Sequence, residues 1–204
     1  GALDLVPIFS YVFLKGKCRG CGSKISPLYP FMELMTGGLF ALSYYQLGFS
    51  AELVVALFFM SLLVIITVSD IAYMLIPDKV LLPFAVLLFG VRLFIPLEPW
   101  WDSIVGAVVG FLLLFLIAVV SKGGMGGGDI KLFFVIGFVL GTMPTLVTLF
   151  LAALIGSVVG VIVLKRTGQG RKTPVAFGPS IAVAAVIAYF WGADLVGWYG
   201  NLLF

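Results

Sequence analysis

The sequence contains no histidine among its 204 residues. This absence excludes Ser-His-Asp triads, Cys-His dyads and zinc hydrolysis at histidine ligands, because each of them needs an imidazole. Only two cysteines are present, so no disulfide framework is expected. Charged residues make up only 10% of the chain, whereas a soluble domain usually has roughly a quarter.

Apolar residues are abundant instead, at 62% of the chain with a mean hydropathy of +1.24. Seven apolar segments follow one another, at residues 30–48, 52–69, 79–96, 101–120, 130–142, 145–164 and 174–192. Crossing a bilayer takes about 20 residues, for which 130–142 is short. We predict an all-α, polytopic transmembrane bundle of about seven helices over residues 30–204, after a small cytoplasmic loop at 1–29. Its surroundings are the lipid bilayer, and we expect no nucleic-acid partner.

Lysine and arginine fall in alternate connections between these segments. They cluster before residue 30, at Lys79, at Lys122 and Lys131, and at residues 165–172. The positive-inside rule assigns these connections to the cytoplasm. Asp70, which ends the second segment, and Asp129, which begins the fifth, are therefore predicted at the same cytoplasmic edge of the bilayer.

Asp70 and Asp129 are the acids whose positions are least explained by local structure. Asp70 follows an apolar run, at a helix end where the macrodipole disfavours negative charge. Asp129 follows a glycine run at residues 123–128; it could cap the fifth helix, with the glycines as a linker and Lys131 as an interfacial anchor. A carboxylate at a membrane edge is costly, however, which favours a functional role.

Two close carboxylates suit peptide hydrolysis. They do not both ionise easily, so the pair shares a proton near working pH. One carboxylate then takes a proton from water while the other donates to the carbonyl oxygen, and the glycines let an extended substrate lie close to Asp129. Other acids fit simpler roles: Asp102 is expected to be solvated or in a helix first turn, and Asp78 to be an N-cap.

The amino-terminal loop contains Cys18 and Cys21 in a Cys-x-x-Cys-Gly sequence. Structural zinc needs four ligands, so this pair is half a site; a redox dithiol or two incidental thiols are the alternatives. Pro30 fits the first turn of the helix that follows, and Glu33 fits the positive end of its dipole.

Several motifs follow one another in a recognisable order. They are Cys18-x-x-Cys21-Gly22, Tyr29-Pro30 with Glu33, Asp70, Ile76-Pro77-Asp78, Gly126-Gly127-Gly128-Asp129-x-Lys131 and Phe177-Gly178-Pro179. This order resembles the bacterial type IV prepilin peptidases, including the processing enzymes of competence pseudopilin systems, over nearly the whole chain. Gly-x-Gly-Asp alone is unspecific, since presenilin-like and archaeal preflagellin peptidases share it, but the loop and the Ile-Pro-Asp motif are more specific.

The resemblance implies an aspartic endopeptidase of the bacterial cytoplasmic (inner) membrane. Such enzymes remove the short basic leader from prepilins or pseudopilins on the cytoplasmic side, in pilus, secretion and competence systems. The catalytic aspartates of the family match Asp70 and Asp129. We expect the neighbouring residues Gly126, Gly127, Gly128 and Lys131 to bind substrate. Cleavage needs no cofactor.

The resemblance also implies a second activity, N-methylation of the new amino terminus with S-adenosylmethionine. The loop glutamate of the family that is tied to methylation matches Glu33. Family members usually have a further membrane helix and a further Cys-x-x-Cys before the point where this chain starts. We therefore expect the chain to be truncated at its amino terminus; a second cysteine pair would complete a zinc site with Cys18 and Cys21.

Two other functions are compatible with the residues alone. The first is a proton-coupled transporter that uses Asp70 and Asp129, although such acids usually lie near the bilayer midplane of repeated halves. The second is a non-enzymatic membrane scaffold whose helices pack through small residues. The motifs that suit such packing are Gly106-x-x-x-Gly110, Gly137-x-x-x-Gly141 and Gly156-x-x-x-Gly160.

Overall fold

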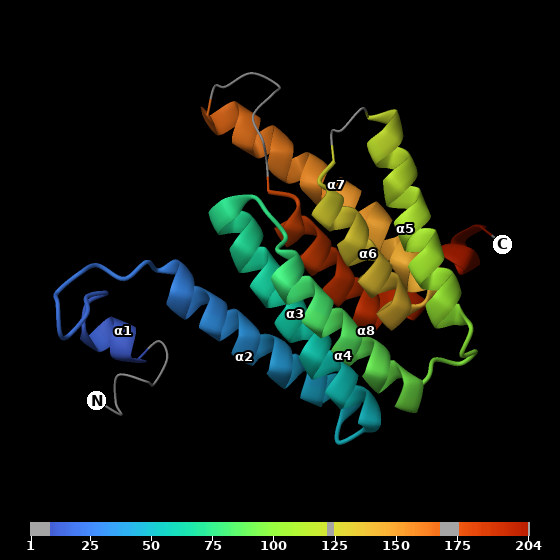
Figure 1. Ribbon diagram of the computed structural model, residues 1–204, viewed down its shortest axis with the longest axis horizontal. Coiled ribbons are helices and arrows are strands. Elements are labelled where there is room, and N and C mark those ends of the chain that lie inside the picture. The colour runs from blue at the N-terminus through green and yellow to red at the C-terminus, as the bar shows by residue number, and fades with distance from the viewer. Residues whose placement is uncertain (1–8, 122–124, 168–175, 204) are drawn as a thin grey trace. The chain divides into compact units, whose positions relative to one another are not determined.

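The computed structural model describes residues 9–121, 125–167 and 176–203 (Figure 1). The helices are α1 (Phe9–Phe13), α2 (Leu28–Leu47), α3 (Ala51–Tyr73), α4 (Asp78–Phe94), α5 (Asp102–Val120), α6 (Gly127–Leu140), α7 (Thr142–Thr167) and α8 (Gly178–Leu203). Apart from one isolated bridge between Lys17 and Lys24, the regular structure in these ranges is helical. The all-α prediction is therefore confirmed: each of the seven predicted segments forms a helix, and α1 is an additional short helix inside the predicted loop.

Four of the described helices are long and apolar enough to cross a membrane. They are Ala51–Tyr73, Asp102–Val120, Thr142–Arg166 and Gly178–Asn201. Helix α6 has 14 residues, or about 21 Å at 1.5 Å per residue, against a hydrocarbon thickness of about 30 Å. The predicted shortness of the fifth segment is thus confirmed, and the four long apolar helices are those of a multi-pass membrane protein.

The chain divides into two compact units, one reaching to Leu53 and the other starting at Val54. This division lies further along the chain than the predicted boundary at residue 29. In the first unit, α1 leads through a turn, in which Cys18 N–H donates to the Ser23 carbonyl (2.8 Å), to α2. The second unit contains most of α3 and all of α4 to α8.

Helix α6 is the centre of the second unit, where it packs on α4, α5, α7 and α8 (Figure 1). Its contact with α5 is close because glycines face each other. A Cβ atom on Gly106 would collide with the Gly137 carbonyl oxygen, and one on Gly110 would lie 2.6 Å from the Phe133 carbonyl oxygen. These contacts confirm the predicted small-residue packing for two of the three motifs; in the third, Gly156 faces the Phe177 ring but Gly160 faces nothing within 4 Å.

Charged side chains hold the end of α6 that lies away from Asp129. The buried Arg92 of α4 donates from Nε (3.1 Å) and Nη2 (2.7 Å) to the carbonyl of Val139. The Asp102 carboxylate accepts from the backbone N–H (3.2 Å) and the hydroxyl (2.6 Å) of Thr142, so it caps α7. Asp102 does lie in the first turn of α5 as expected, but its carboxylate serves the neighbouring helix. The Arg92 contact thus holds the end of α6, and the Asp102 contact holds the start of α7 that directly follows it.

Candidate active site

Asp70 lies in the last turn of α3, where it is buried with 7% of its surface exposed. Its Oδ2 accepts a hydrogen bond of 2.6 Å from the backbone N–H of Gly178, the first residue of α8. The positive end of the α8 dipole therefore offsets the unfavourable position of this acid at the end of α3. A Cβ atom on Gly178 would lie 2.7 Å from Oδ2, so glycine is required for this approach.

Asp129 is the third residue of α6, outside the four apolar spans, and it is half-buried. The pKa of its carboxyl is raised to about 6, chiefly by burial and also by the charge of Asp70, while a backbone hydrogen bond with Gly126 opposes this rise. The effect of Asp70 means that the two carboxylates lie close enough to interact. The fold thus brings together two acids from α3 and α6 that are far apart in the sequence.

The glycines before Asp129 have two different environments. A Cβ atom on Gly128 would lie 2.7 Å from Cβ of Ile76, so Gly128 lets the α3–α4 connection pack against the start of α6. Gly126 and Gly127 are exposed, and the Cβ position of Gly127 faces open space. Substrate binding by residues 126–128 stays a prediction, while Gly123 and Gly124 lie outside the described residues.

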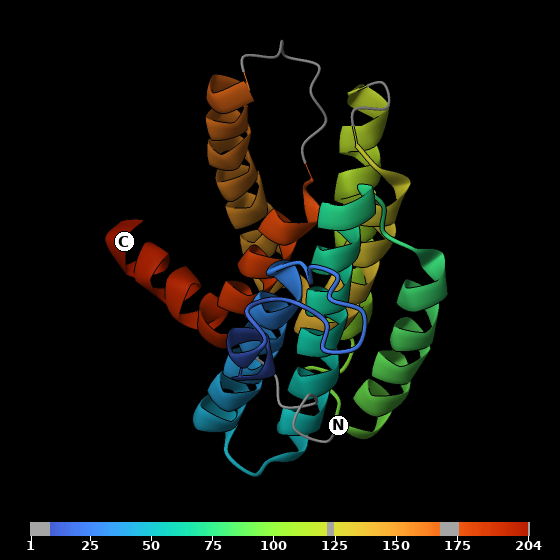
Figure 2. The same ribbon diagram turned by 90° about the vertical axis from the view of Figure 1, so that its left-hand side faces the viewer.

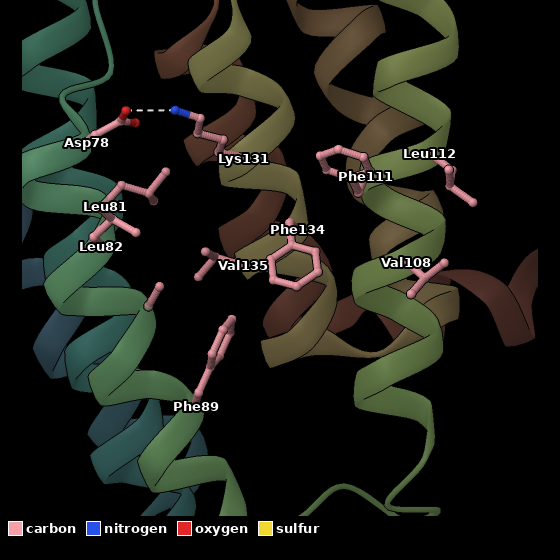
Figure 3. Close-up of a pocket in the computed structure, with 11 residues that line it drawn as sticks. Asp78, Leu81, Leu82, Phe89, Val108, Phe111, Leu112, Lys131, Phe134 and Val135 are labelled. Atoms are coloured by element: carbon pink, nitrogen blue, oxygen red, sulfur yellow. Dashed lines mark hydrogen bonds and ion pairs between the residues drawn. The ribbon is translucent and has the colours of Figure 1, made fainter.

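Lys131 donates from Nζ to Oδ2 of Asp78 at 2.7 Å, and both side chains are about half exposed (Figure 3). The N-cap role expected for Asp78 is wrong, because Asp78 is the first residue of α4, Pro77 precedes it, and its carboxylate is drawn to the ammonium on α6. Substrate binding by Lys131 stays a prediction, although its charge is engaged by Asp78. Together, the Ile76–Gly128 and Asp78–Lys131 contacts join the Ile-Pro-Asp and Gly-Gly-Gly-Asp-x-Lys motifs on either side of Asp129.

Glu33 lies in the second turn of α2, which belongs to the first unit. It lines a cavity of about 320 Å³ together with Tyr11, Cys18, Arg19 and Tyr29. All residues that line this cavity belong to the first unit, whereas Asp70 and Asp129 belong to the second.

Cys18 and Cys21 are both free thiols. Cys21 Sγ lies 3.0 Å from Oγ of Ser23, and this contact, together with the Ser23 backbone and the Cys18 side chain, lowers the pKa of the Cys21 thiol to about 7. The part of the chain that the structure describes holds no group of three or more histidine, cysteine or acidic side chains able to ligate a metal. The two thiols therefore supply half of a four-ligand zinc site, and the other ligands would have to come from outside the described residues.

These observations define a class of protein: a multi-pass helical membrane protein with a pair of neighbouring carboxylates between its helices. The family model described as "Type IV leader peptidase family" matches residues 57–161, which include Asp70 and Asp129. A second model, "Bacterial Peptidase A24 N-terminal domain", matches residues 1–47, which include Cys18, Cys21 and Glu33.

Curated relatives cover almost the whole chain. A "Prepilin leader peptidase/N-methyltransferase" of Bacillus subtilis (strain 168) is 43% identical over 196 residues, which cover 96% of this chain and 79% of the relative. Proteins with the same name are 35% identical over 206 residues in Aeromonas salmonicida (strain A449), covering 97% and 70%, and 36% identical over 202 residues in Xanthomonas campestris pv. campestris, covering 95% and 69%. No solved structure matches the chain.

The chain belongs to the type IV leader peptidase family, and it is a peptidase. The resemblance that the motifs indicated is thereby confirmed. The transporter and scaffold alternatives are not favoured, since the family and the relatives are named for peptide cleavage.

Proposed function

We propose that this protein is an integral-membrane aspartic endopeptidase that removes the basic leader from prepilins or pseudopilins at the cytoplasmic face of the inner membrane. The observation that carries the proposal is the juxtaposition of the buried Asp70 with the half-buried Asp129 in a chain of this family. The cytoplasmic location rests on the basic connections that flank both acids.

The two carboxylates have different environments, which suit different roles. A backbone N–H can only donate, so Oδ2 of Asp70 is an acceptor toward Gly178, as a carboxylate that takes a proton from water must be. Asp129, with its raised pKa, is the partner that carries a proton. Water then bonds to the scissile carbonyl carbon, Asp70 takes the water proton and Asp129 protonates the carbonyl oxygen. Breakage of the carbon–nitrogen bond follows, with a proton passing to the amine.

The test is a cleavage assay in detergent with a prepilin-like peptide that carries a basic leader, with mass spectrometry of the products. We expect the wild-type protein to yield one leader and one mature fragment. Asp70→Ala and Asp129→Ala should each abolish this product while the protein still folds, whereas Asp194→Ala, at an exposed position of α8, should cleave normally. Cleavage retained by either single active-site variant would contradict the proposed roles.

A second activity, N-methylation of the new amino terminus, is supported by the cavity in the first unit. At about 320 Å³ it is at the lower end of the size range for small-molecule sites. Its lining includes the Glu33 carboxylate and the Arg19 guanidinium, which suit the cationic and carboxylate groups of S-adenosylmethionine. This cofactor would supply the methyl group. Zinc at Cys18 and Cys21 is likewise proposed only together with further ligands.

Glu33→Gln tests the second activity separately from the first. Because the cavity and the carboxylate pair belong to different units, we expect the variant to cleave the peptide at the wild-type rate but to leave its new amino terminus unmethylated. Product masses 14 Da apart, about the mass of one methylene group, report both outcomes in one spectrum. Full methylation by Glu33→Gln would remove Glu33 from this role.

A further inference from the structure

A groove of about 440 Å³ runs along α6 between α4 and α5 (Figure 3). Its walls are apolar, and three phenylalanines, Phe89, Phe111 and Phe134, come from the three helices. The ring of Phe134 makes edge contacts with the other two, at centroid distances of 5.8 Å and 6.3 Å. The groove therefore has an aromatic lining to which three helices of the second unit contribute.

The groove is open because α4 and α5 each pack on α6, which lies between them (Figure 3). Figure 2 shows α4 at the edge of the second unit. Its length follows α4 from Asp78 to Phe89. The eleven residue steps from Asp78 to Phe89 correspond to about 16 Å of helix, which is roughly half the hydrocarbon thickness of a bilayer. The groove thus extends from the level of Asp78 well into the apolar depth of the protein.

One end of the groove lies at the same end of α6 as Asp129. The charged residues of its lining, Asp78 and Lys131, form their ion pair at this end (Figure 3). Asp129 precedes Lys131 by two residues on the same helix, which places the two side chains about 200° apart around α6. The groove and the catalytic carboxylates therefore lie on different sides of the same helix end.

We propose that this groove binds the apolar segment of the peptide substrate that follows the scissile bond. The inference rests on the proposed function. The leader before the scissile bond is basic, so an apolar aromatic wall is a poor surface for it. The segment after the bond enters the membrane when the bond is at its edge. An apolar groove that begins at Lys131, on the same helix end as Asp129, and runs along α6 into the apolar part of the protein provides a path for it.

The geometry also limits the length of substrate between the two sites. A chain leaving the groove beside Lys131 passes around the exposed start of α6, at Gly126 and Gly127, to reach Asp129. The path is half the circumference of a helix end, and an extended chain covers about 3.3 Å per residue, so three to five residues suffice, on the order of 10–16 Å. The apolar segment of the substrate should therefore begin within about five residues of the scissile bond.

A second lateral groove, of about 420 Å³, provides a built-in comparison. Residues of α3, α7 and α8 line it, among them Ile71, Val159 and Val183. Along α7 it extends only from Ile155 to Val163, about 12 Å, and its described lining carries no charged side chain. The first groove is longer and its charged end marks the membrane edge, so we assign the substrate to the first.

Filling the groove tests the proposal by kinetics. Leu112 lines it and is half exposed, so Leu112→Trp should occupy the space without disturbing the core; Leu154→Trp, on a half-exposed part of α7 outside both grooves, is the matched control. With a substrate that carries its apolar segment, we expect Leu112→Trp to raise KM about tenfold at unchanged kcat, and Leu154→Trp to match the wild type. Equal KM values for both variants would overturn the proposal.

Photo-cross-linking gives an independent result. In the Asp70→Asn background, p-benzoylphenylalanine replaces Leu112, Val159 or Leu154 in turn, and the protein in nanodiscs is mixed with the same peptide. We expect cross-links to the apolar segment from position 112 only. Cross-links from position 159, or from position 112 to lipid alone, would overturn the assignment. Wild-type protein that cleaves nothing would instead contradict the proposed function, so the two failures are distinguishable.

Discussion

At the scale of single residues, the site depends on backbone groups as much as on side chains. The carboxylate of Asp70 is held by one N–H, that of Gly178, at the start of a helix from the far end of the sequence. Gly128 has a comparable role near Asp129, because its lack of a side chain lets Ile76 pack close to the start of α6. The two acids therefore have their chemistry set by residues without side chains of their own.

Gly178→Ala tests this dependence. The added methyl group would lie 2.7 Å from Oδ2 and 2.9 Å from Cβ of Asp70, so the carboxylate must move away from the N–H. We expect kcat to fall at least 100-fold, about 2.7 kcal/mol of transition-state stabilisation, while the protein remains folded. Gly197→Ala is the control on the same helix, because its Cβ position faces nothing within 4 Å. Normal cleavage by Gly178→Ala would contradict the assigned contact.

The pH profile of cleavage reports on Asp129. Its pKa of about 6 lies above the ordinary 3.8, so the carboxyl keeps its proton below about pH 6 and loses it as the pH rises through that value. Because Asp129 is the proposed proton donor, we expect kcat/KM to fall on the alkaline side of about pH 6. Steady-state kinetics with the prepilin-like peptide across pH 4 to 8, on the order of ten points, measures this limb; a rate that rises steadily through pH 6 would reverse the roles of the two acids.

Some of these residues could be predicted from the sequence and some could not. Asp70 and Asp129 stand out because each is costly where the pattern puts it. The hydrogen-bond partners of Asp70 and Asp78 cannot be predicted from local sequence patterns, because Gly178 is 108 residues from Asp70 and Lys131 is 53 residues from Asp78. The one sequence signal for Gly178 is its position directly before Pro179, at the start of an apolar segment.

At the scale of elements, α6, which carries the proposed proton donor Asp129, is short and is held along its length and at its far end. Glycines fix it against α5, and Arg92 and Asp102 fix its far end. Its near end can therefore present Asp129 at a defined depth beside Asp70.

Gly137→Ala tests the contact between α5 and α6. A Cβ atom there would collide with the carbonyl of Gly106, and since both groups are backbone, neither can rotate away. We expect a loss of stability of about 1–3 kcal/mol, seen as earlier thermal unfolding in detergent. Gly90→Ala, in α4, meets nothing within 4 Å and serves as the control. Equal unfolding temperatures for the two variants would show that α5 and α6 are not this close.

Element ends were harder to predict than the elements themselves. The apolar runs predict seven helices, and all seven form. Helix α3, however, continues past residue 69 to Tyr73, and α8 continues past residue 192 to Leu203. Polar residues at these places indicated an end, but the Asp70 carboxylate has a partner in α8, so the helix can continue through it.

At the scale of the whole molecule, the residues proposed for cleavage and for methylation fall on two compact units. The carboxylate pair, its glycines and the substrate groove lie entirely after Val54, and the cavity with Glu33 lies entirely before it. The positions of lysine and arginine predict on which face of the membrane the site lies, but they do not predict this division. The polar loop and the apolar helix α2 form one unit, although their compositions differ.

The central claim is that Asp70 and Asp129 act as one catalytic pair. A double-mutant cycle tests it most directly: cleavage rates of the wild type, Asp70→Asn, Asp129→Asn and the double variant are measured on one prepilin-like peptide. Groups that act as a unit are strongly non-additive, so we predict that both single variants and the double variant share the same residual rate. A single variant that keeps substantial activity, or losses that multiply in the double variant, would contradict the account.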